Sequence, residues 1–151
     1  MKILFVCTGN TCRSPMAEGI ARDMFTKNNV RNHFVRSAGI QNITGEPASD
    51  NAIMVMQEID LDISRHISTL VRRELMEEAD KILTMTIAQR DLLKIAYFDI
   101  DNIDEKVQTL SYFANVEDRD VIDPFFGDIE IYRKTRDEIK ELIEKSNWEG
   151  K

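Results

Sequence analysis

The stretch that decides the fold of this chain is Cys7-Thr8-Gly9-Asn10-Thr11-Cys12-Arg13-Ser14. The residues before it, 2–6, form a short and mostly apolar run, which predicts a buried strand that ends at the Gly-Asn turn. After it, Ser14 and Pro15 are typical of a helix N-cap and of the first helical position. The stretch is therefore predicted to be a loop that joins the first strand to the first helix.

The residue types in this loop predict an anion site with a nucleophile at its base. The loop amides and the helix N-terminus would point at one place, where their partial positive charges favour an anion such as phosphate. These surroundings favour the thiolate form of Cys7, which is the form that attacks phosphorus. Arg13 adds a rigid fork of donors that can hold two phosphate oxygens, and Ser14 can donate a hydrogen bond to the sulfur. The five residues between Cys7 and Arg13 are enough for the backbone to wrap one tetrahedral anion.

Length and composition indicate a folded protein of one domain, residues 1–151. With 42% hydrophobic and 31% charged residues, the chain is unlike a disordered one. Its net charge of -7 argues against nucleic acid or an anionic membrane as the main partner. An acidic protein that binds phosphate must create positive potential locally, as the loop amides and Arg13 would.

The chain has two cysteines, Cys7 and Cys12, which are too few for a disulfide framework. A free functional thiol belongs in a reducing compartment, so the predicted location is the cytoplasm. The apolar run near the N-terminus ends too soon for a signal peptide or a membrane span.

Beyond the loop, the sequence alternates between strands and helices. Further strands are predicted at residues 34–35, 81–85 and 106–110, and the last should lie at a sheet edge because half of it is polar. A tight turn is predicted at 37–39 and a solvated connection at 97–105. Helices are predicted at residues 16–28, 48–58, 72–78, 87–96 and 129–145, the last with Ile131, Ile139, Leu142 and Ile143 in the core. This order predicts a doubly wound α/β domain.

At these residues the chain resembles the low-molecular-weight protein tyrosine phosphatases, whose signature is a Cys, five residues and then Arg-Ser next to the N-terminus. The likeness covers nearly the whole chain. It includes Arg36-Ser37-Ala38-Gly39, Ser64-Arg65-His66 and Asp123-Pro124-Phe125. The resemblance implies a four-stranded parallel sheet with helices on both faces and a phosphate-binding loop after the first strand, where open α/β sheets place ligands.

The resemblance also implies catalytic roles for three residues. Cys7 would be the nucleophile that forms a phosphocysteine, Arg13 would hold the phosphate, and Asp123 would act as general acid and then as base. On the residues alone, Asp123 before a proline is more simply a turn former. No metal and no other cofactor are implied.

Other residues would bind the substrate or support the loop. By the same resemblance, Asn10, Ser37 and His66 form a hydrogen-bond network that keeps the loop rigid, whereas His33 looks like a surface residue. Cys12 is either a small buried side chain or the partner that captures an oxidised Cys7 in a disulfide. The predicted substrate-binding residues are Thr8, Gly9, Asn10, Thr11, Cys12, Ser14 and Phe125.

Thr11 bears most on the identity of the substrate. Relatives that act on phosphotyrosine usually carry a bulky aliphatic residue here, and the loop looks like that of the bacterial protein-arginine phosphatase branch. Thr11 would crowd a phenyl ring and could fit a thin phosphoguanidinium group, whose guanidinium could also pair with Asp123. The plainer alternative is drift within a tyrosine phosphatase. Phe125 fits the arginine branch, and Phe126 departs from it.

The leading hypothesis is therefore a phosphatase for phosphoarginine in proteins or peptides, with inorganic phosphate as product and inhibitor. Phosphotyrosine hydrolysis by the same machinery is the alternative. An arsenate reductase is disfavoured because no cysteine follows Cys12, and a non-catalytic phospho-residue binding module is disfavoured because Cys7, Arg13 and Asp123 occur together. Neither nucleic acid nor a membrane is predicted as a partner, and the loop lacks the Gly-Lys of a nucleotide-binding loop.

Overall fold

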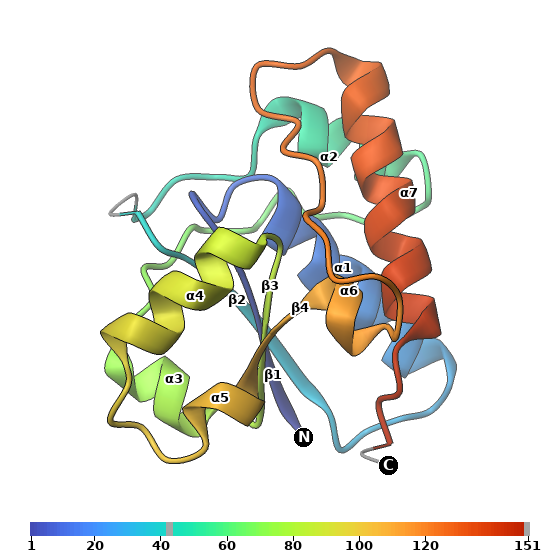
Figure 1. Ribbon diagram of the computed structural model, residues 1–151. Helices are drawn as coiled ribbons and strands as arrows, with labels where there is room; N and C mark the ends of the chain where they lie inside the picture. The colour runs from blue at the N-terminus through green and yellow to red at the C-terminus, as the bar shows by residue number, and fades with distance from the viewer. Residues whose placement is uncertain (42–43, 150–151) are drawn as a thin grey trace.

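A parallel sheet lies at the centre of the computed structural model, which describes residues 1–41 and 44–149 (Figure 1). Within these residues the sheet has four strands in the order β2-β1-β3-β4. They are β1 (Lys2–Cys7), β2 (Phe34–Gly39), β3 (Lys81–Thr84) and β4 (Val107–Thr109). The first two strands in the chain, β1 and β2, are neighbours, and β3 then pairs with the opposite side of β1. The strand order therefore reverses at β1, and its carboxyl end is the switch point where such folds bind ligands.

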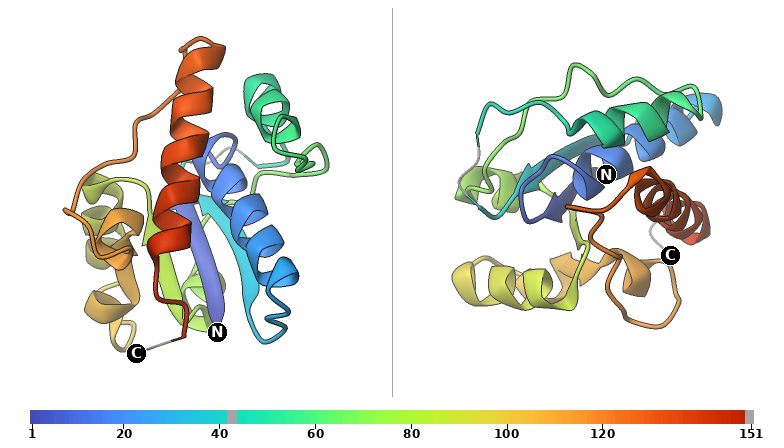
Figure 2. Two further views of the ribbon diagram at one scale, coloured as in Figure 1. Left: turned by 90° about the vertical axis from the view of Figure 1, so that its right-hand side faces the viewer. Right: turned by 90° about the horizontal axis from the view of Figure 1, so that it is seen from above.

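Helices cover both faces of this sheet, as the two further views show (Figure 2). One face carries α1 (Arg13–Lys27) and α7 (Ile129–Lys145), with α2 (Asp50–Gln57) packed beside them. The other face carries α3 (Arg73–Glu78), α4 (Ile87–Ala96) and α5 (Ile103–Lys106), while α6 (Leu110–Phe113) follows β4 and reaches α7. The predicted α/β fold class is confirmed.

The first strand is buried on both sides, which explains why its sequence is a nearly continuous apolar run. Ile3, Phe5 and Cys7 belong to the core beneath α1 and α7. Leu4 and Val6 point the other way, into the core beneath α3, α4 and α5. The thiol of Cys7 therefore emerges at the end of the strand on the side where α1 begins.

The start of α1 differs from the prediction that Ser14 is its N-cap. Cys12 precedes the helix without a side-chain cap, and Ser14 is already helical. The hydroxyl of Ser14 is occupied elsewhere, because it lies 2.9 Å from Cys7 Sγ and accepts a hydrogen bond from Asn10. Ser14, a residue type that usually caps a helix, therefore hydrogen-bonds to loop residues instead.

The ends of other helices and strands differ from the predicted ones, in part because neighbouring segments contribute hydrogen bonds. β2 runs through the predicted turn at 37–39, since Ala38 and Gly39 pair with the end of β1. α2 begins at Asp50 because Ser49 accepts a hydrogen bond from the Ala52 amide. The predicted connection at 97–105 contains the start of α5, and β4 is indeed an edge strand.

Side-chain burial follows the predictions with two exceptions. Ile139, Leu142 and Ile143 of α7 are buried, while Ile131 is only half-buried. His33 is half-buried rather than a surface residue and packs edge-on against the Phe25 ring, with ring centroids 4.8 Å apart. No helix in the described part of the chain has the length and apolar character needed to cross a membrane.

Candidate active site

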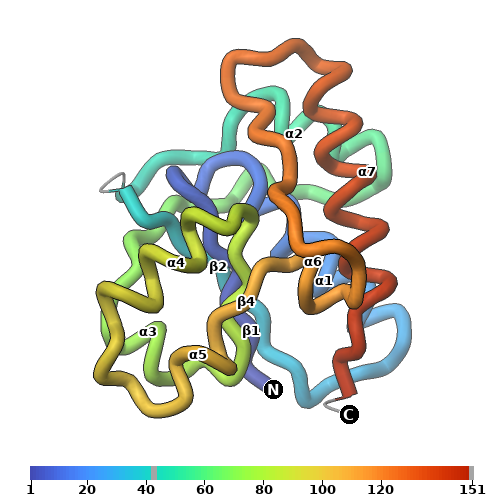
Figure 3. Tube along the Cα trace, viewed as in Figure 1, coloured from blue at the N-terminus to red at the C-terminus, as the bar shows by residue number. Residues whose placement is uncertain are grey.

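Cys7 is the last residue of β1, and the loop that follows it leads into α1; Figure 3 shows how the backbone connects these two elements. Its side chain is buried, and its sulfur has two polar neighbours. Ser14 Oγ lies 2.9 Å from Sγ, and the Asn10 amide donates a hydrogen bond to Sγ at 3.3 Å. Both groups can donate hydrogen bonds to a sulfur that carries negative charge.

Asn10 holds the loop in shape. It is fully buried and has a φ of 55°, a left-handed backbone conformation that asparagine tolerates better than most residues. Its side-chain amide donates to Ser14 Oγ at 2.7 Å and to Ser37 Oγ at 2.9 Å, while its side-chain carbonyl accepts from the Thr69 amide at 2.9 Å. One side chain thus ties the loop to α1, to β2 and to the segment before α3.

His66 and Ser37 complete this arrangement, which the structure brings together from three distant parts of the chain. His66 Nε2 lies 2.7 Å from the Asn10 carbonyl oxygen, so this nitrogen carries the proton and donates. Ser37 donates in turn to Glu18 at 2.6 Å. Sequence reasoning did not assign a role to Glu18, because its partner Ser37 is 19 residues away in the chain.

Gly39 allows β2 to pass directly against the loop. A Cβ atom at this position would lie 2.9 Å from the Gly9 carbonyl carbon and 3.0 Å from the Thr8 carbonyl oxygen. Both neighbours are backbone atoms, so any larger residue would displace the loop. The glycine of Ser37-Ala38-Gly39 is therefore required by a close backbone approach.

Gln89 on α4 supports the opposite side of the loop and was missed by sequence reasoning. Its Nε2 donates to Thr8 Oγ1 at 3.0 Å, and its Oε1 accepts from the amides of Met85 and Thr86. A glutamine three residues after a threonine N-cap indicates a capping box, which is present, but that motif does not indicate a contact with the loop.

Arg13 and Asp123 approach each other across the mouth of the loop. Arg13 is buried, and one guanidinium nitrogen donates to the Val121 carbonyl at 3.0 Å. Its other terminal nitrogen lies 3.5 Å from Asp123 Oδ2. Asp123 Oδ1 also accepts a hydrogen bond from the Phe125 amide at 3.1 Å, so the aspartate forms the turn that its position before proline indicates.

A cavity of about 110 Å³ opens above Cys7, which is room for a few water molecules or one small anion. Its lining consists of Cys7, Thr8, Gly9, Thr11, Cys12, Arg13, Gln41, Asp123 and Phe125. Of the other predicted site residues, Asn10 and Ser14 are fully buried beneath the loop, and Ser37 and His66 lie behind it. Gln41 was not predicted.

Cys12 has polar partners that the sequence did not suggest. Its sulfur lies 3.4 Å from Ser49 Oγ and 3.5 Å from the Tyr132 hydroxyl, and both cysteines are free thiols. Burial, together with the contact to Cys12, raises the pKa of Tyr132 to about 12, so this hydroxyl keeps its proton near neutral pH. Whether Cys12 also protects Cys7 as a disulfide partner stays a prediction.

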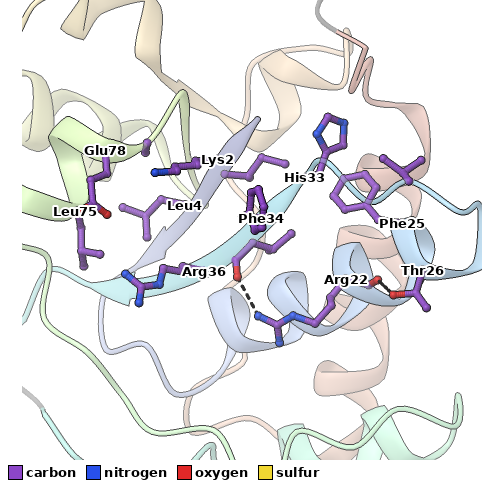
Figure 4. Close-up of a pocket in the computed structure, with 14 residues that line it drawn as sticks. Lys2, Leu4, Arg22, Phe25, Thr26, His33, Phe34, Arg36, Leu75 and Glu78 are labelled. Carbon is purple, nitrogen blue, oxygen red and sulfur yellow. Dashed lines mark hydrogen bonds between the residues drawn. The ribbon is translucent and has the colours of Figure 1, made fainter.

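A larger hollow of about 490 Å³ lies around β2, away from the loop (Figure 4). Its lining includes Lys2, Phe25, Phe34 and Leu75 and none of the predicted site residues. The volume of a cavity therefore does not identify the candidate active site in this protein. In the part of the chain that the structure describes, no three His, Cys, Asp or Glu side chains are grouped to hold a metal ion.

The family model described as low molecular weight phosphotyrosine protein phosphatase matches residues 2–147. The protein-arginine-phosphatase of Bacillus subtilis is 38% identical over 143 residues, which span 95% of this chain and 92% of that protein. The low molecular weight protein-tyrosine-phosphatase PtpB of Staphylococcus aureus is 37% identical over 145 residues, 96% of each chain.

A solved structure of the YwlE arginine phosphatase superposes with a TM-score of 0.90 at 37% identity and covers 96% of this chain and 92% of that chain. That structure is a cysteine-to-serine variant whose active-site serine is phosphorylated. The resemblance inferred from the loop is confirmed by these matches. This chain belongs to the low molecular weight phosphotyrosine protein phosphatase family.

Proposed function

We propose that this protein hydrolyses phosphoarginine in proteins or peptides through a phosphocysteine on Cys7. One observation carries the proposal, namely that a single small cavity is lined by Cys7, Arg13 and Asp123. A nucleophile, an anion clamp and a proton carrier thus face the same space. The names of the relatives, protein-arginine-phosphatase and protein-tyrosine-phosphatase, support the reaction class.

In the first step the phosphoryl group occupies the loop, and its oxygens accept hydrogen bonds from the loop amides and from Arg13. The Cys7 thiolate attacks phosphorus and forms the S–P bond as the P–N bond to the arginine side chain breaks. Asp123, protonated at this stage, gives its proton to the leaving nitrogen. With this proton, the side chain of a phosphoguanidinium substrate departs as the guanidinium of arginine, and Asp123 is left as a carboxylate.

In the second step the Asp123 carboxylate removes a proton from a water molecule, which attacks phosphorus as the S–P bond breaks. The thiolate is regenerated beside Ser14 and the Asn10 amide, both of which can stabilise its charge. Inorganic phosphate leaves last. Because it fits the same loop, it should inhibit the enzyme by competing with substrate.

The choice of phosphoarginine rests on the walls of the cavity. Thr11 lines it, and its hydroxyl lies 3.8 Å from Cys12 Sγ, so the wall is polar and branched at the place where a phenyl ring would need apolar contact. Asp123 is half exposed, and once it has given up its proton its carboxylate can make a two-bond contact with the departing guanidinium group.

Phosphotyrosine is the second candidate, and a specific observation favours it. Phe125 lines the cavity, and its ring packs against the ring of Phe126 with centroids 4.2 Å apart, which offers an aromatic surface of the kind that binds a phenyl ring. The similarity to PtpB supports the same reading.

We place the protein in the cytoplasm, since a free nucleophilic thiol requires a reducing compartment. Its partners would be phosphorylated proteins. The net charge of -7 disfavours nucleic acid.

The test compares initial rates on two peptides of one sequence, carrying either phosphoarginine or phosphotyrosine, for the natural protein and for Thr11→Ile. We expect a preference for phosphoarginine that weakens or inverts in Thr11→Ile. Thr11→Val is the matched control, because it keeps the branched shape and removes only the hydroxyl. A preference for phosphotyrosine in all three proteins would overturn the assignment to phosphoarginine.

A further inference from the structure

A third cavity, of about 480 Å³, lies on the far side of the loop from the mouth above Cys7. It is formed by α1, β2 and the segment that leads to α3, and it shares no lining residue with the cavity at Cys7. A volume of this size is in the range of small-molecule sites. The proposed reaction does not use this space.

The lining of this cavity is strongly cationic in a chain whose net charge is -7. Four arginines line it: Arg22, Arg36, Arg65 and Arg72. The lining contains one carboxylate, Glu18, and that group is already held by Arg22 at 2.8 Å and by Ser37 at 2.6 Å. The local charge therefore opposes the overall charge, and the cavity should attract anions.

Two of these arginines are available for a ligand. Within residues 1–41 and 44–149, the side chains of Arg36 and Arg65 make no hydrogen bond and no ion pair. The Ser64 hydroxyl lowers the pKa of the Asp62 carboxylate, and the positive charge of Arg65 lowers it further. Arg22, by contrast, reaches across to the Val35 carbonyl at 2.8 Å, as the close-up shows beside Arg36 (Figure 4).

The guanidinium groups suit a phosphoryl ligand in particular. A guanidinium presents its donors in a planar fork that matches two oxygens of one phosphate, and several such groups around one hollow can share a dianion. Ser37, His66 and Thr69 add polar groups to the same lining.

The cavity is also connected to the nucleophile by short hydrogen bonds. Ser37, His66 and Thr69 each hydrogen-bond to Asn10, at 2.9, 2.7 and 2.9 Å. The Asn10 amide donates to Cys7 Sγ. A ligand that contacts the lining therefore touches the residues that hold the catalytic loop in shape.

We propose that this cavity binds a phosphoryl group other than the one at Cys7, either as inorganic phosphate or as a second phosphorylated side chain of a protein substrate. The proposal does not depend on which phosphorylated residue the enzyme hydrolyses. The bound phosphoryl group would act on the catalytic loop through the lining residues that hydrogen-bond to Asn10.

The test is a titration of the 15N-labelled protein with inorganic phosphate, followed by NMR. We expect the side-chain Nε–H resonances of Arg36 and Arg65 to shift along a saturation curve separate from that of the loop amides of Thr8 and Gly9. In Arg36→Gln/Arg65→Gln the loop curve should persist, and affinity at the second site, followed at the Ser37 and Thr69 amides, should fall about tenfold or more.

Two further variants keep the result interpretable. Arg31→Gln/Lys134→Gln removes the same charge from exposed positions outside this lining and should leave both curves unchanged. Arg36→Lys/Arg65→Lys keeps the charge without the planar fork and should bind with intermediate affinity. Unmoved Nε–H resonances of Arg36 and Arg65, at phosphate concentrations that saturate the loop, would overturn the proposal.

A second experiment separates the two sources of the phosphoryl group. Peptides with one or two copies of whichever phosphorylated residue is hydrolysed faster are bound to Cys7→Ala, which has no nucleophile to accept the phosphoryl group, and are measured by calorimetry. A gain of about tenfold for the doubly phosphorylated peptide, lost in Arg36→Gln/Arg65→Gln, assigns the site to the substrate. Equal affinities, with the phosphate-induced shifts present, assign it to free phosphate.

Discussion

The two parts of the candidate active site, the loop with Cys7 and the segment with Asp123, differ in burial and in hydrogen bonding. The loop that carries Cys7 is buried, and its central residue, Asn10, makes hydrogen bonds with both its backbone and its side chain. The segment that carries Asp123 is open to solvent, with Asp123 56% exposed and Phe126 95% exposed. The proposed nucleophile is thus preorganised, whereas the proposed proton carrier lies on a segment that is open to solvent.

The largest expected effect comes from the buried half. Cys7→Ser should reduce turnover by at least roughly 10⁴-fold, because the serine hydroxyl is a far weaker nucleophile at neutral pH. The substitution keeps a small group that can hydrogen-bond to Ser14, so the melting temperature should change little. Steady-state kinetics and thermal unfolding measure both. Substantial turnover in Cys7→Ser would show that the nucleophile lies elsewhere.

Asp123→Asn tests the exposed half. We expect kcat to fall roughly 10²- to 10⁴-fold, since proton transfer to the leaving group is lost. Asparagine can still form the turn with the Phe125 amide, so stability should be preserved. A substrate with a good leaving group, such as an aryl phosphate with a low-pKa phenol, should lose much less in the first step. An equal loss for good and poor leaving groups would contradict the role as general acid.

Asn10→Ala tests whether rigidity of the loop matters for catalysis. Three side-chain hydrogen bonds disappear at a buried position with positive φ, so unfolding free energy should fall by about 3 kcal/mol and kcat roughly 10- to 100-fold. Asn29→Ala is the matched control, because Asn29 has a similar φ of 57° in an exposed turn. Chemical denaturation and kinetics measure the pair. Unchanged kcat in Asn10→Ala would mean that the network supports the fold alone.

The smallest effect is expected at Phe126, on the exposed half. Its φ is 66°, which is unfavourable for an aromatic residue, so Phe126→Gly should raise unfolding free energy by up to about 1 kcal/mol. With phosphoarginine as substrate, kcat/KM should change less than about threefold, since the ring is 95% exposed. Phe125→Leu is the comparison, because that residue lines the cavity. A large loss of kcat/KM in Phe126→Gly with phosphotyrosine, but not with phosphoarginine, would instead favour recognition of an aromatic substrate.

Sequence reasoning was most accurate where the pattern is local. The strand at Lys2–Cys7, the loop and the helices α1 and α7 follow from hydrophobic periodicity and from the Gly-Asn turn, which act over a few residues. It was wrong about the N-cap at Ser14, because the usual preference of serine for that position was overridden by a hydrogen bond to a residue seven positions earlier. It missed Gln89 and Glu18 because both act through distant partners.

The sequence by itself determined that a cysteine and an arginine six residues apart sit between a buried strand and a helix, which is the basis of the anion site. The family resemblance implied that Asn10, Ser37 and His66 meet, whereas only the tertiary structure added Thr69 to them, since these residues come from separate segments. It alone gathered Arg22, Arg36, Arg65 and Arg72 around one cavity. The physical reason is that contacts between distant residues depend on strand register and helix packing, which no local spacing records.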